Sequence, residues 1–353
     1  MNKVQIHASH PYQVLIGDGI LADLGAYIRE VCNPGKVAII SDDRVWPLYG
    51  SQVYATLEKA GMNQVVHFVF PAGEQSKCGA VYLEILEYLA QAQLTRSDCL
   101  LALGGGVVGD ITGFAAATYL RGIAYIQIPT TLLAAVDSSV GGKTAIDLPS
   151  GKNLAGAFYQ PSLVLCDTKT LNTLPENIFR DGCAEVIKYA VLFDEELFAH
   201  LEQHGPEFDR EWVIRRCICH KRDVVEQDEF DLGLRQKLNL GHTVGHAIEA
   251  KSAYDISHGE AVAMGMAIVA KAASAFGYCG EDVYRKILAL LKAFGLPTAT
   301  EYDAATLYRY TLSDKKRAAA KISLVIPRRI GACDIVSMDI QRVESFIKEG
   351  ISS

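Results

Sequence analysis

Apolar residues in the first half of the chain form short continuous runs, and amphipathic stretches separate these runs. The stretches, such as 45–60 and 80–92, have helical periodicity. Apolar strands that alternate with helices are typical of a parallel sheet covered on both faces. The pattern therefore predicts an α/β unit. Its expected strands are residues 37–40, 65–70, 99–103, 123–128 and 163–166, and polar residues or glycine follow within a few positions of each end.

The pattern changes near Leu174, where long amphipathic helices begin. A strand pair at 321–326 and 332–336 is expected among them, and no flexible linker separates the two halves. We predict an N-terminal α/β domain of residues 1–173, with a mostly parallel sheet, and an all-α C-terminal domain of residues 174–353. The expected helices of the second domain are 175–192, 195–204, 211–226, 240–251, 260–276 and 282–294.

Composition narrows the class of protein. The 353 residues carry a net charge of -7, which argues against a nucleic-acid partner. Nine cysteines without a CxxC pair indicate reduced thiols. The N-terminus lacks a signal-peptide core, and the longest apolar stretch, 261–276, contains Lys271 and is too short to span a bilayer. We expect a cytoplasmic protein that does not enter the membrane.

A group of histidines is the most distinctive motif. His242, His246 and Glu249 stand at steps of four and three, so they share one face of a predicted helix, and His258 begins the next helix. Glycines at positions 241 and 245 would let a second element approach closely. A polar helix face or a hydrogen-bonded buried histidine would explain one isolated pair. The third histidine favours a metal site.

A catalytic zinc site with two histidines needs a third ligand, and Glu185 is the natural candidate. The alternative is an i,i+3 ion pair between Glu185 and Lys188 on the helix surface. The apolar residues between 186 and 191 place both charges on the other side of the helix. Periodicity does not distinguish a side that faces water from one that faces a cleft.

The segment Gly104–Asp110 reads GGGVVGD, follows an apolar run and opens a predicted helix. It fits G-x-G-x-x-G, in which the backbone approaches a pyrophosphate and helix amides bind it, although glycine turns also serve packing. The usual ribose-binding acid, about 20 residues later, is missing, and Asp42 or Glu74 could replace it. We predict a Rossmann-like site with a non-standard strand order. A first-turn acid favoured by the helix dipole is the alternative for Asp110.

Two further segments, 137–144 and 150–153, are rich in Gly, Ser and Lys and follow Pro129 and two threonines. Such turns are usually solvated loops. Because two of them follow one strand end, we expect loops that bind anions.

Several long motifs occur in a fixed order along the chain. They are GGGVVGD, YLRGI, IPTTLLAAVDSSVGGKT and SGKN between residues 104 and 153, AEVIKYAVL at 184–192, GLRQKLNLGHTVGHAIEA at 233–250 and HGEAV at 258–262. In this order and spacing they resemble the 3-dehydroquinate synthases, a branch of the sugar-phosphate cyclase family. The resemblance covers most of the chain, from about residue 36 to about residue 335.

The resemblance implies two cofactors. Glu185, His242 and His258 would ligate one zinc ion, which Co²⁺ could replace. NAD would be the second cofactor. Its implied contacts are Asp42, Glu74, Lys77, Gly105, Gly106, Val107, Asp110, Thr130, Thr131, Lys143, Lys152, Thr173 and Leu174.

The activity implied is a lyase reaction of the shikimate pathway, which leads to chorismate and the aromatic amino acids. A phosphorus-oxygen lyase would convert 3-deoxy-D-arabino-heptulosonate 7-phosphate to 3-dehydroquinate and phosphate. The steps are transient oxidation by NAD, phosphate elimination, re-reduction and aldol cyclisation. His246 would be the proton shuttle or a support of the metal site, and Arg121 would reach the phosphate from the neighbouring subunit of a homodimer. The other implied substrate contacts are Asp137, Lys143, Asn153, Lys188, Lys221, Arg235 and Asn239.

The chain departs from the family's pattern at two places. Asp231 stands where many members carry Glu, and Ala319–Ala320 replaces a loop that contains glycine. Both departures concern fine substrate contacts. The alternatives are another sugar-phosphate cyclase and a metal-dependent polyol dehydrogenase of the same fold. Arg235 and Asn239 favour a substrate with a carboxylate, since guanidinium groups suit planar partners.

Overall fold

The structure is a computed structural model that describes residues 1–253, 255–314 and 321–352. Ala319–Ala320 therefore lies outside the described residues. The chain divides into two compact units, which we call unit 1 and unit 2. Unit 1 consists of Met1–Pro175 and Arg210–Phe230, and unit 2 consists of Glu176–Asp209 and Asp231–Ser353.

Unit 1 is built on a mostly parallel sheet, as the apolar runs predict. Within the described residues, seven strands form this sheet in the order β1-β2-β9-β6-β5-β3-β4, and only the β1–β2 pair is antiparallel. The prediction of a Rossmann-like sheet with a non-standard order is confirmed. The strands are β1 (Asn2–Ile6), β2 (Tyr12–Gly17), β3 (Val37–Asp42), β4 (Val65–Phe70), β5 (Cys99–Gly104), β6 (Ala124–Pro129) and β9 (Leu163–Asp167).

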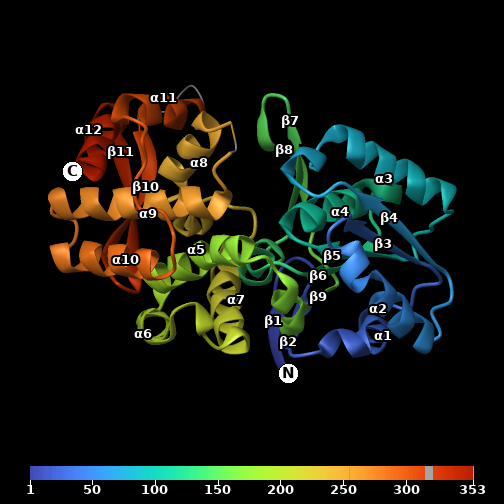
Figure 1. Cartoon of the computed structure of the whole chain (residues 1–353). Coiled ribbons are helices and arrows are strands. Elements are labelled where there is room, and N and C mark those ends of the chain that lie inside the picture. Colours follow the sequence, from blue (N-terminus) through green and yellow to red (C-terminus); the bar gives the residue numbers. More distant parts are fainter. Residues whose placement is uncertain (254, 315–320, 353) are drawn as a thin grey trace. The chain divides into compact units, whose positions relative to one another are not determined.

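Helices cover both faces of this sheet (Figure 1). Ile39 and Leu101 pack with residues of α1 and α2 in one core cluster, whereas the neighbouring residues Ile40 and Leu100 pack with residues of α3 and α4 in another. Because both faces are buried, inner strands such as β5 (CLLALG) are apolar along nearly their whole length. The helices of unit 1 are α1 (Leu24–Val31), α2 (Trp46–Lys59), α3 (Gly79–Gln91), α4 (Gly106–Thr118) and α7 (Arg210–Gln227).

Two parts of unit 1 differ from the sequence-based expectation. Of the two expected anion-binding loops, residues 143–144 and 151–153 instead lie in an antiparallel hairpin of β7 (Lys143–Leu148) and β8 (Gly151–Phe158). Helix α7, expected in the helical domain, contacts β1 and β2 and belongs to unit 1. Short helical turns connect the other elements, namely η1 (Ile20–Asp23), η2 (Glu74–Ser76), η3 (Tyr119–Arg121), η4 (Ala134–Ser138) and η5 (Thr168–Thr173).

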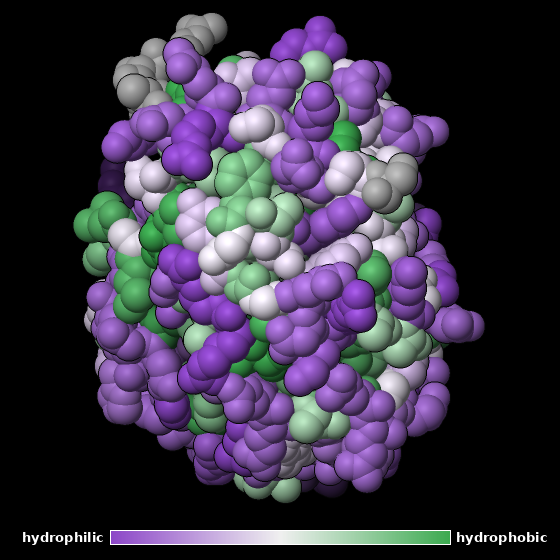
Figure 2. Space-filling model, turned by 90° about the vertical axis from the view of Figure 1, so that its left-hand side faces the viewer, coloured by the Kyte–Doolittle hydropathy of each residue, from purple (hydrophilic) through white to green (hydrophobic). Residues whose placement is uncertain are grey.

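Unit 2 is mainly helical. Helix α12 buries one face, with Val343, Phe346 and Ile347, whereas α9 is buried at every position from Ala261 to Ala270. Hydrophilic side chains cover most of the face shown in Figure 2, with hydrophobic residues between them. The elements are α5 (Glu176–Phe193), α6 (Glu195–His204), η6 (Gly205–Glu207), η7 (Leu234–Asn239), α8 (His242–Lys251), α9 (His258–Ala275), α10 (Glu281–Ala293), α11 (Ala304–Asp314), the antiparallel pair β10 (Lys321–Arg329) and β11 (Ala332–Asp339), and α12 (Ile340–Ile351).

No helix among the described residues is long and apolar enough to cross a membrane. All nine cysteines lie within the described residues and are free.

Candidate active site

Three predicted metal ligands meet inside unit 2. Nε2 of His242 and Nε2 of His258 each lie 3.5 Å from Oε1 of Glu185. One ligand atom from each residue lies within 4.8 Å of the others. One carboxylate and two imidazoles are a ligand set that suits zinc or cobalt, with room for a substrate oxygen as a further ligand. The residues present therefore fit a divalent cation.

Helices α8 and α9 bring the two histidines together because glycines let their backbones approach closely. A Cβ on Gly265 of α9 would lie 2.0 Å from the carbonyl oxygen of Gly241, and a Cβ on Gly245 of α8 would lie 2.9 Å from that of Ala261. Gly241 also has a φ of +77°, which favours glycine. The glycines within the histidine motif thus permit the close approach that the sequence predicts.

Glu185 enters the site from α5 together with Lys188. Both side chains are buried, with exposures of 0% and 1%, and Nζ of Lys188 contacts Oε2 of Glu185. The alternative of an ion pair on the helix surface is therefore wrong. Lys188 contacts one carboxylate oxygen and leaves Oε1 directed to the two histidines, which orients Glu185 for ligation.

Each histidine ring is held in place by a hydrogen-bond acceptor that lies close to its Nδ1 atom. Nδ1 of His242 lies 3.0 Å from the carbonyl oxygen of Leu240, and Nδ1 of His258 lies 3.3 Å from Oε2 of Glu249. Both contacts leave Nε2 as the atom that faces Glu185. Sequence reasoning gave Glu249 a place on the helix face but no role, because the contact depends on the path between α8 and α9.

Burial dominates at His242 and hydrogen-bonded carboxylates dominate at His258, so the pKa values of the two rings shift in opposite directions. Burial lowers the pKa of His242 to about 3, and the charge of Lys188 acts in the same direction. Burial also lowers the pKa of His258, but hydrogen bonds to Glu185 and Glu249 and their negative charges outweigh it and raise the value to about 10. His242 is therefore neutral at pH 7 without a metal, whereas His258 carries a proton.

Asp181 fixes the start of α9, and sequence reasoning missed it. Its Oδ1 accepts hydrogen bonds from Ser257 Oγ at 2.5 Å, from the Gly259 amide at 2.7 Å and from the Glu260 amide at 3.3 Å. Ser257 and Glu260 form a capping box, which the sequence Ser-x-x-Glu could have indicated. Asp181 itself lies on α5, far from Ser257 in the sequence, so no local pattern reveals its contribution to this cap.

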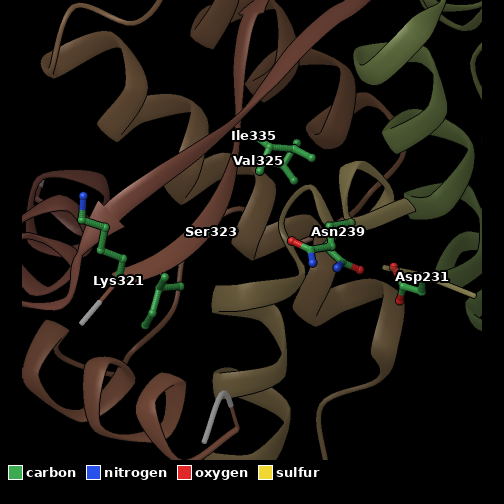
Figure 3. Close-up of a pocket in the computed structure, with 8 residues that line it drawn as sticks. Asp231, Asn239, Lys321, Ser323, Val325 and Ile335 are labelled. Atoms are coloured by element: carbon green, nitrogen blue, oxygen red, sulfur yellow. The ribbon is translucent and has the colours of Figure 1, made fainter. Parts of the chain in front are cut away.

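One residue expected to bind the substrate lines a cavity of unit 2. Asn239 of η7 lines a cavity of about 370 Å³ (Figure 3). The departure from the family's pattern, Asp231, lines the same cavity. Arg235, on the same turn as Asn239, is buried, with an exposure of 3%. His246, one turn after His242 on α8, has its ring centroid 6.1 Å from that of His258.

The glycine motif of unit 1 has the predicted geometry for a phosphate. Gly104 ends β5, and Gly106 begins α4, so the first amides of a long helix lie at the strand end. A Cβ on Gly105 would lie 2.9 Å from Cγ2 of Thr131, and one on Gly106 would lie 3.1 Å from Oγ of Ser138. The turn has room for backbone only. These residues therefore fit the pyrophosphate of a dinucleotide.

Further predicted nucleotide contacts gather around Lys77. Nζ of Lys77 lies 2.5 Å from Oδ2 of Asp110 and 2.6 Å from Oδ1 of Asn153. Burial disfavours the charge of Lys77, but the negative charges of Asp110, Glu74 and Asp147 and the hydrogen bond to Asp110 together outweigh it and raise the lysine's pKa. Asp110 is thus an ion-pair partner, and it lies beyond the first turn of α4, so the alternative of a first-turn acid does not hold. Lys152 approaches Glu74, with Nζ 3.6 Å from Oε1.

The remaining predicted residues of unit 1 lie at strand ends and turns. Oδ1 of Asp42 accepts hydrogen bonds from the amides of Arg44 and Val45, at 2.9 and 2.8 Å. Lys221 of α7 contacts Asp137 at 2.9 Å.

The other predicted residues of unit 1 are placed by their elements. Thr130 directly follows β6. Thr173 ends η5 and shares a hydrogen bond with Tyr49, and Leu174 follows Thr173. Val107 belongs to the first turn of α4, Lys143 begins β7, and Arg121 is exposed in η3.

Comparisons with known proteins agree with these features. Two family models match, described as 3-dehydroquinate synthase N-terminal for residues 67–181 and 3-dehydroquinate synthase C-terminal for residues 182–317. The chain is 48% identical to the 3-dehydroquinate synthase of Pelobacter propionicus over 340 residues, which are 94% of each chain. It is 43% identical to that of Enterococcus faecalis over 349 residues, which are 97% of each chain.

Solved structures of sugar-phosphate cyclases have the same fold. A 2-deoxy-scyllo-inosose synthase complexed with carbaglucose-6-phosphate, NAD⁺ and Co²⁺ is 26% identical with a TM-score of 0.89, covering 99% of this chain and 100% of that one. The 2-epi-5-epi-valiolone synthase of Streptomyces hygroscopicus, with NAD⁺ and Zn²⁺ bound, is 27% identical with a TM-score of 0.86, covering 98% of both. A glycerol dehydrogenase of Schizosaccharomyces pombe, 14% identical with a TM-score of 0.64, shares the fold alone, over 96% of this chain and 88% of that one.

Proposed function

This chain belongs to the 3-dehydroquinate synthase family, and on that premise we propose which of its residues carry out the family's reaction. The reaction converts 3-deoxy-D-arabino-heptulosonate 7-phosphate to 3-dehydroquinate and phosphate. The alternatives of another cyclase or a polyol dehydrogenase are not favoured, since the relatives over nearly the whole chain are 3-dehydroquinate synthases. The observation that carries the proposal is the meeting of Glu185, His242 and His258.

Glu185, His242 and His258 hold a divalent cation, zinc or cobalt. The support is the ligand set and the neutral state of His242, whose pKa burial lowers to about 3. When bound, the cation polarises a substrate oxygen and NAD accepts a hydride and later returns it. Lys188 keeps the carboxylate of Glu185 oriented and adds a positive charge for an anionic substrate.

Cationic and amide side chains bind the two anionic ends of the substrate. Arg235 and Asn239 are suited to the carboxylate, since a guanidinium binds a planar group with two hydrogen bonds. The burial of Arg235 supports this role, because water competes less for a buried cation. The residues that we assign to the rest of the substrate are Asp137, Lys143, Asn153, Lys188 and Lys221. His246 moves a proton to or from the substrate.

The nucleotide binds in unit 1 at the ends of the parallel strands, where ligands of open α/β sheets bind. The backbone of Gly105, Gly106 and Val107 receives the pyrophosphate at the start of α4. Asp42 or Glu74 accepts hydrogen bonds from the ribose. Lys77, Asp110, Thr130, Thr131, Lys143, Lys152, Thr173 and Leu174 complete this site.

The active form is a homodimer in which Arg121 binds the substrate phosphate of the neighbouring subunit. Two successive residues, Leu120 and Arg121, have positive φ values of 51° and 67°. Such backbone costs free energy in non-glycine residues and often occurs at functional sites. A mixture of inactive Arg121→Ala and inactive Lys188→Ala should regain activity. Failure to regain it in demonstrated heterodimers would contradict the sharing. The cytoplasmic location stays a prediction.

The main test is incubation of the protein with the heptulosonate phosphate and catalytic NAD. We expect release of phosphate and formation of 3-dehydroquinate, identified by NMR, without a net rise in absorbance at 340 nm. A steady rise at 340 nm with a simple polyol would instead indicate a dehydrogenase. His242→Ala and His258→Ala should each lose bound zinc and keep the fold, and retention of one zinc per chain would reject the ligand assignment.

A further inference from the structure

Glu249 is a buried carboxylate that contacts the metal cluster, and the proposed function assigns it no role. Its exposure is 4%. It follows His242 by seven residues on α8, which is two helical turns, so both side chains lie on the same face. Carboxylates are almost never fully buried unless a partner compensates the lost hydration. The burial of Glu249 therefore requires compensating partners, and one of them belongs to the metal cluster.

This partner of Glu249 is a predicted metal ligand. Oε2 of Glu249 lies 3.3 Å from Nδ1 of His258, while Nε2 of the same ring lies 3.5 Å from Oε1 of Glu185. An imidazole that ligates a cation through Nε2 keeps its proton on Nδ1 and donates it to an acceptor. Glu249 is placed to be that acceptor.

The two histidines have supports of different charge. His242 donates to the neutral carbonyl oxygen of Leu240 at 3.0 Å, whereas His258 faces a carboxylate. A hydrogen bond to an ionised acceptor is stronger than one to a neutral group, and it makes the imidazole a better ligand. The charged support is therefore specific to His258.

The negative charge of Glu249 also affects the affinity of the site for a cation, because Lys188 places a positive charge in the same cluster. Its ammonium group contacts Glu185 in the buried cluster and therefore opposes the binding of a cation. Glu249 lies on the other side of His258 and contributes a compensating negative charge. Electrostatic interactions are strong here because the groups are withdrawn from water.

We propose that Glu249 is a positioning residue for the metal site: it fixes the orientation and tautomer of His258 through Nδ1, and its charge increases the affinity of the site for a divalent cation. This inference rests on the metal site proposed above. It concerns the affinity for the cation, which is measured without the reaction.

The test is a competition titration of the full chain with Zn²⁺ and a chromophoric chelator. Glu249→Gln keeps the shape of the side chain and removes its charge, and it should raise the Kd for zinc by about 10- to 100-fold. Glu249→Asp keeps the charge and should lose less. Glu281→Gln is the control, because it removes an exposed carboxylate of α10 that pairs with Arg285 at 2.7 Å. Its Kd should equal that of the wild type.

Cobalt provides a signature that a purely structural carboxylate would not affect. In the Co²⁺-loaded wild type, NMR should show two strongly shifted, solvent-exchangeable protons, those on Nδ1 of His242 and His258. Glu249→Gln should move one of them and leave the other in place. The wild-type spectrum tests the proposal even if the variants do not fold, since a single exchangeable signal would contradict a proton held between His258 and Glu249.

The outcomes separate this inference from the proposed function. A wild type that binds no zinc would reject the metal site itself. One zinc per chain with equal affinity in the wild type and Glu249→Gln would reject only the role of Glu249. Two ions per chain would overturn it as well, because His246, Glu249 and His258 also have ligand atoms within 4.8 Å of one another and would then hold a second cation.

Discussion

Oδ1 of Asp181 on α5 accepts a hydrogen bond of 2.7 Å from the backbone amide of Gly259 on α9. Asp181 lies one helical turn before Glu185, and Gly259 directly follows His258. One contact between the helices therefore fixes the spacing of two proposed metal ligands that are far apart in the sequence. A Cβ on Gly259 would lie 2.0 Å from the carbonyl oxygen of Asp181, so the approach also requires glycine.

Asp181→Ala should lower the free energy of unfolding by about 2 kcal/mol, because the amides of Gly259 and Glu260 lose a buried acceptor. It should also weaken zinc binding, since the start of α9 carries His258. Urea unfolding and zinc titration measure the two effects. Asp303→Ala is a matched control, as Asp303 caps α11 through the Thr306 amide at 2.7 Å. It should cost about 1 kcal/mol and leave zinc affinity unchanged; equal zinc affinity in Asp181→Ala would contradict the coupling.

Gly265→Ala should separate α8 from α9. The added Cβ would lie 2.0 Å from the carbonyl oxygen of Gly241, a backbone atom that cannot move by rotating a side chain. We expect a loss of about 2–3 kcal/mol in urea unfolding and weaker zinc binding. Gly79→Ala in α3 has nothing within 4 Å of the new Cβ and should be neutral or stabilising by up to about 1 kcal/mol. Equal effects of the two substitutions would show that the helices tolerate the extra atom.

Zinc binding should release one proton per ion between pH 5 and pH 6.5. The pKa of His258 is about 10 without metal, so its ring must lose a proton before it ligates, whereas His242, with a pKa of about 3, has none to lose. Apparent zinc affinity should therefore rise with pH, by about tenfold per unit. Titration in a weakly buffered indicator solution measures the release. If both histidines instead had the ordinary pKa of about 6.5, zinc binding would release about two protons at pH 5 and about one at pH 6.5. That result would contradict the prediction.

Lys77→Met should destabilise unit 1 because it leaves Asp110 without the ammonium group that lies 2.5 Å away. Removal of one partner of a buried pair costs about 3 kcal/mol or more. The double variant Lys77→Met, Asp110→Asn should regain part of that loss in urea unfolding. Arg285→Met removes a partner from an exposed pair on α10 and should cost less than about 1 kcal/mol. A similar cost for both single variants would mean that burial adds nothing to the Lys77 pair.

Much of the site followed from local sequence patterns. Steps of four and three placed His242, His246 and Glu249 on one helix face, and a missing third ligand directed attention to Glu185. The pattern left open whether Glu185 and Lys188 face water, because helix periodicity shows which side is apolar but not what covers the polar side. Their burial is a property of the packed unit.

Two features of the fold escaped prediction for a similar reason. The hairpin of β7 and β8 has no clear alternation of apolar and polar residues, and Gly151 and Asn153 have positive φ values. Its sequence therefore looks like a loop. Helix α7 has an ordinary amphipathic pattern, which predicts a helix correctly but does not identify β1 and β2 as its neighbours.

The assignment of Arg210–Phe230 to unit 1 has a topological consequence. The chain passes from one unit to the other after Pro175, after Asp209 and after Phe230. A protease that nicks the backbone at one of these crossings would leave two covalent connections intact. Limited digestion there should yield a cleaved polypeptide on a denaturing gel but no independently released domain, and unit 2 cannot be expressed as a single uninterrupted fragment.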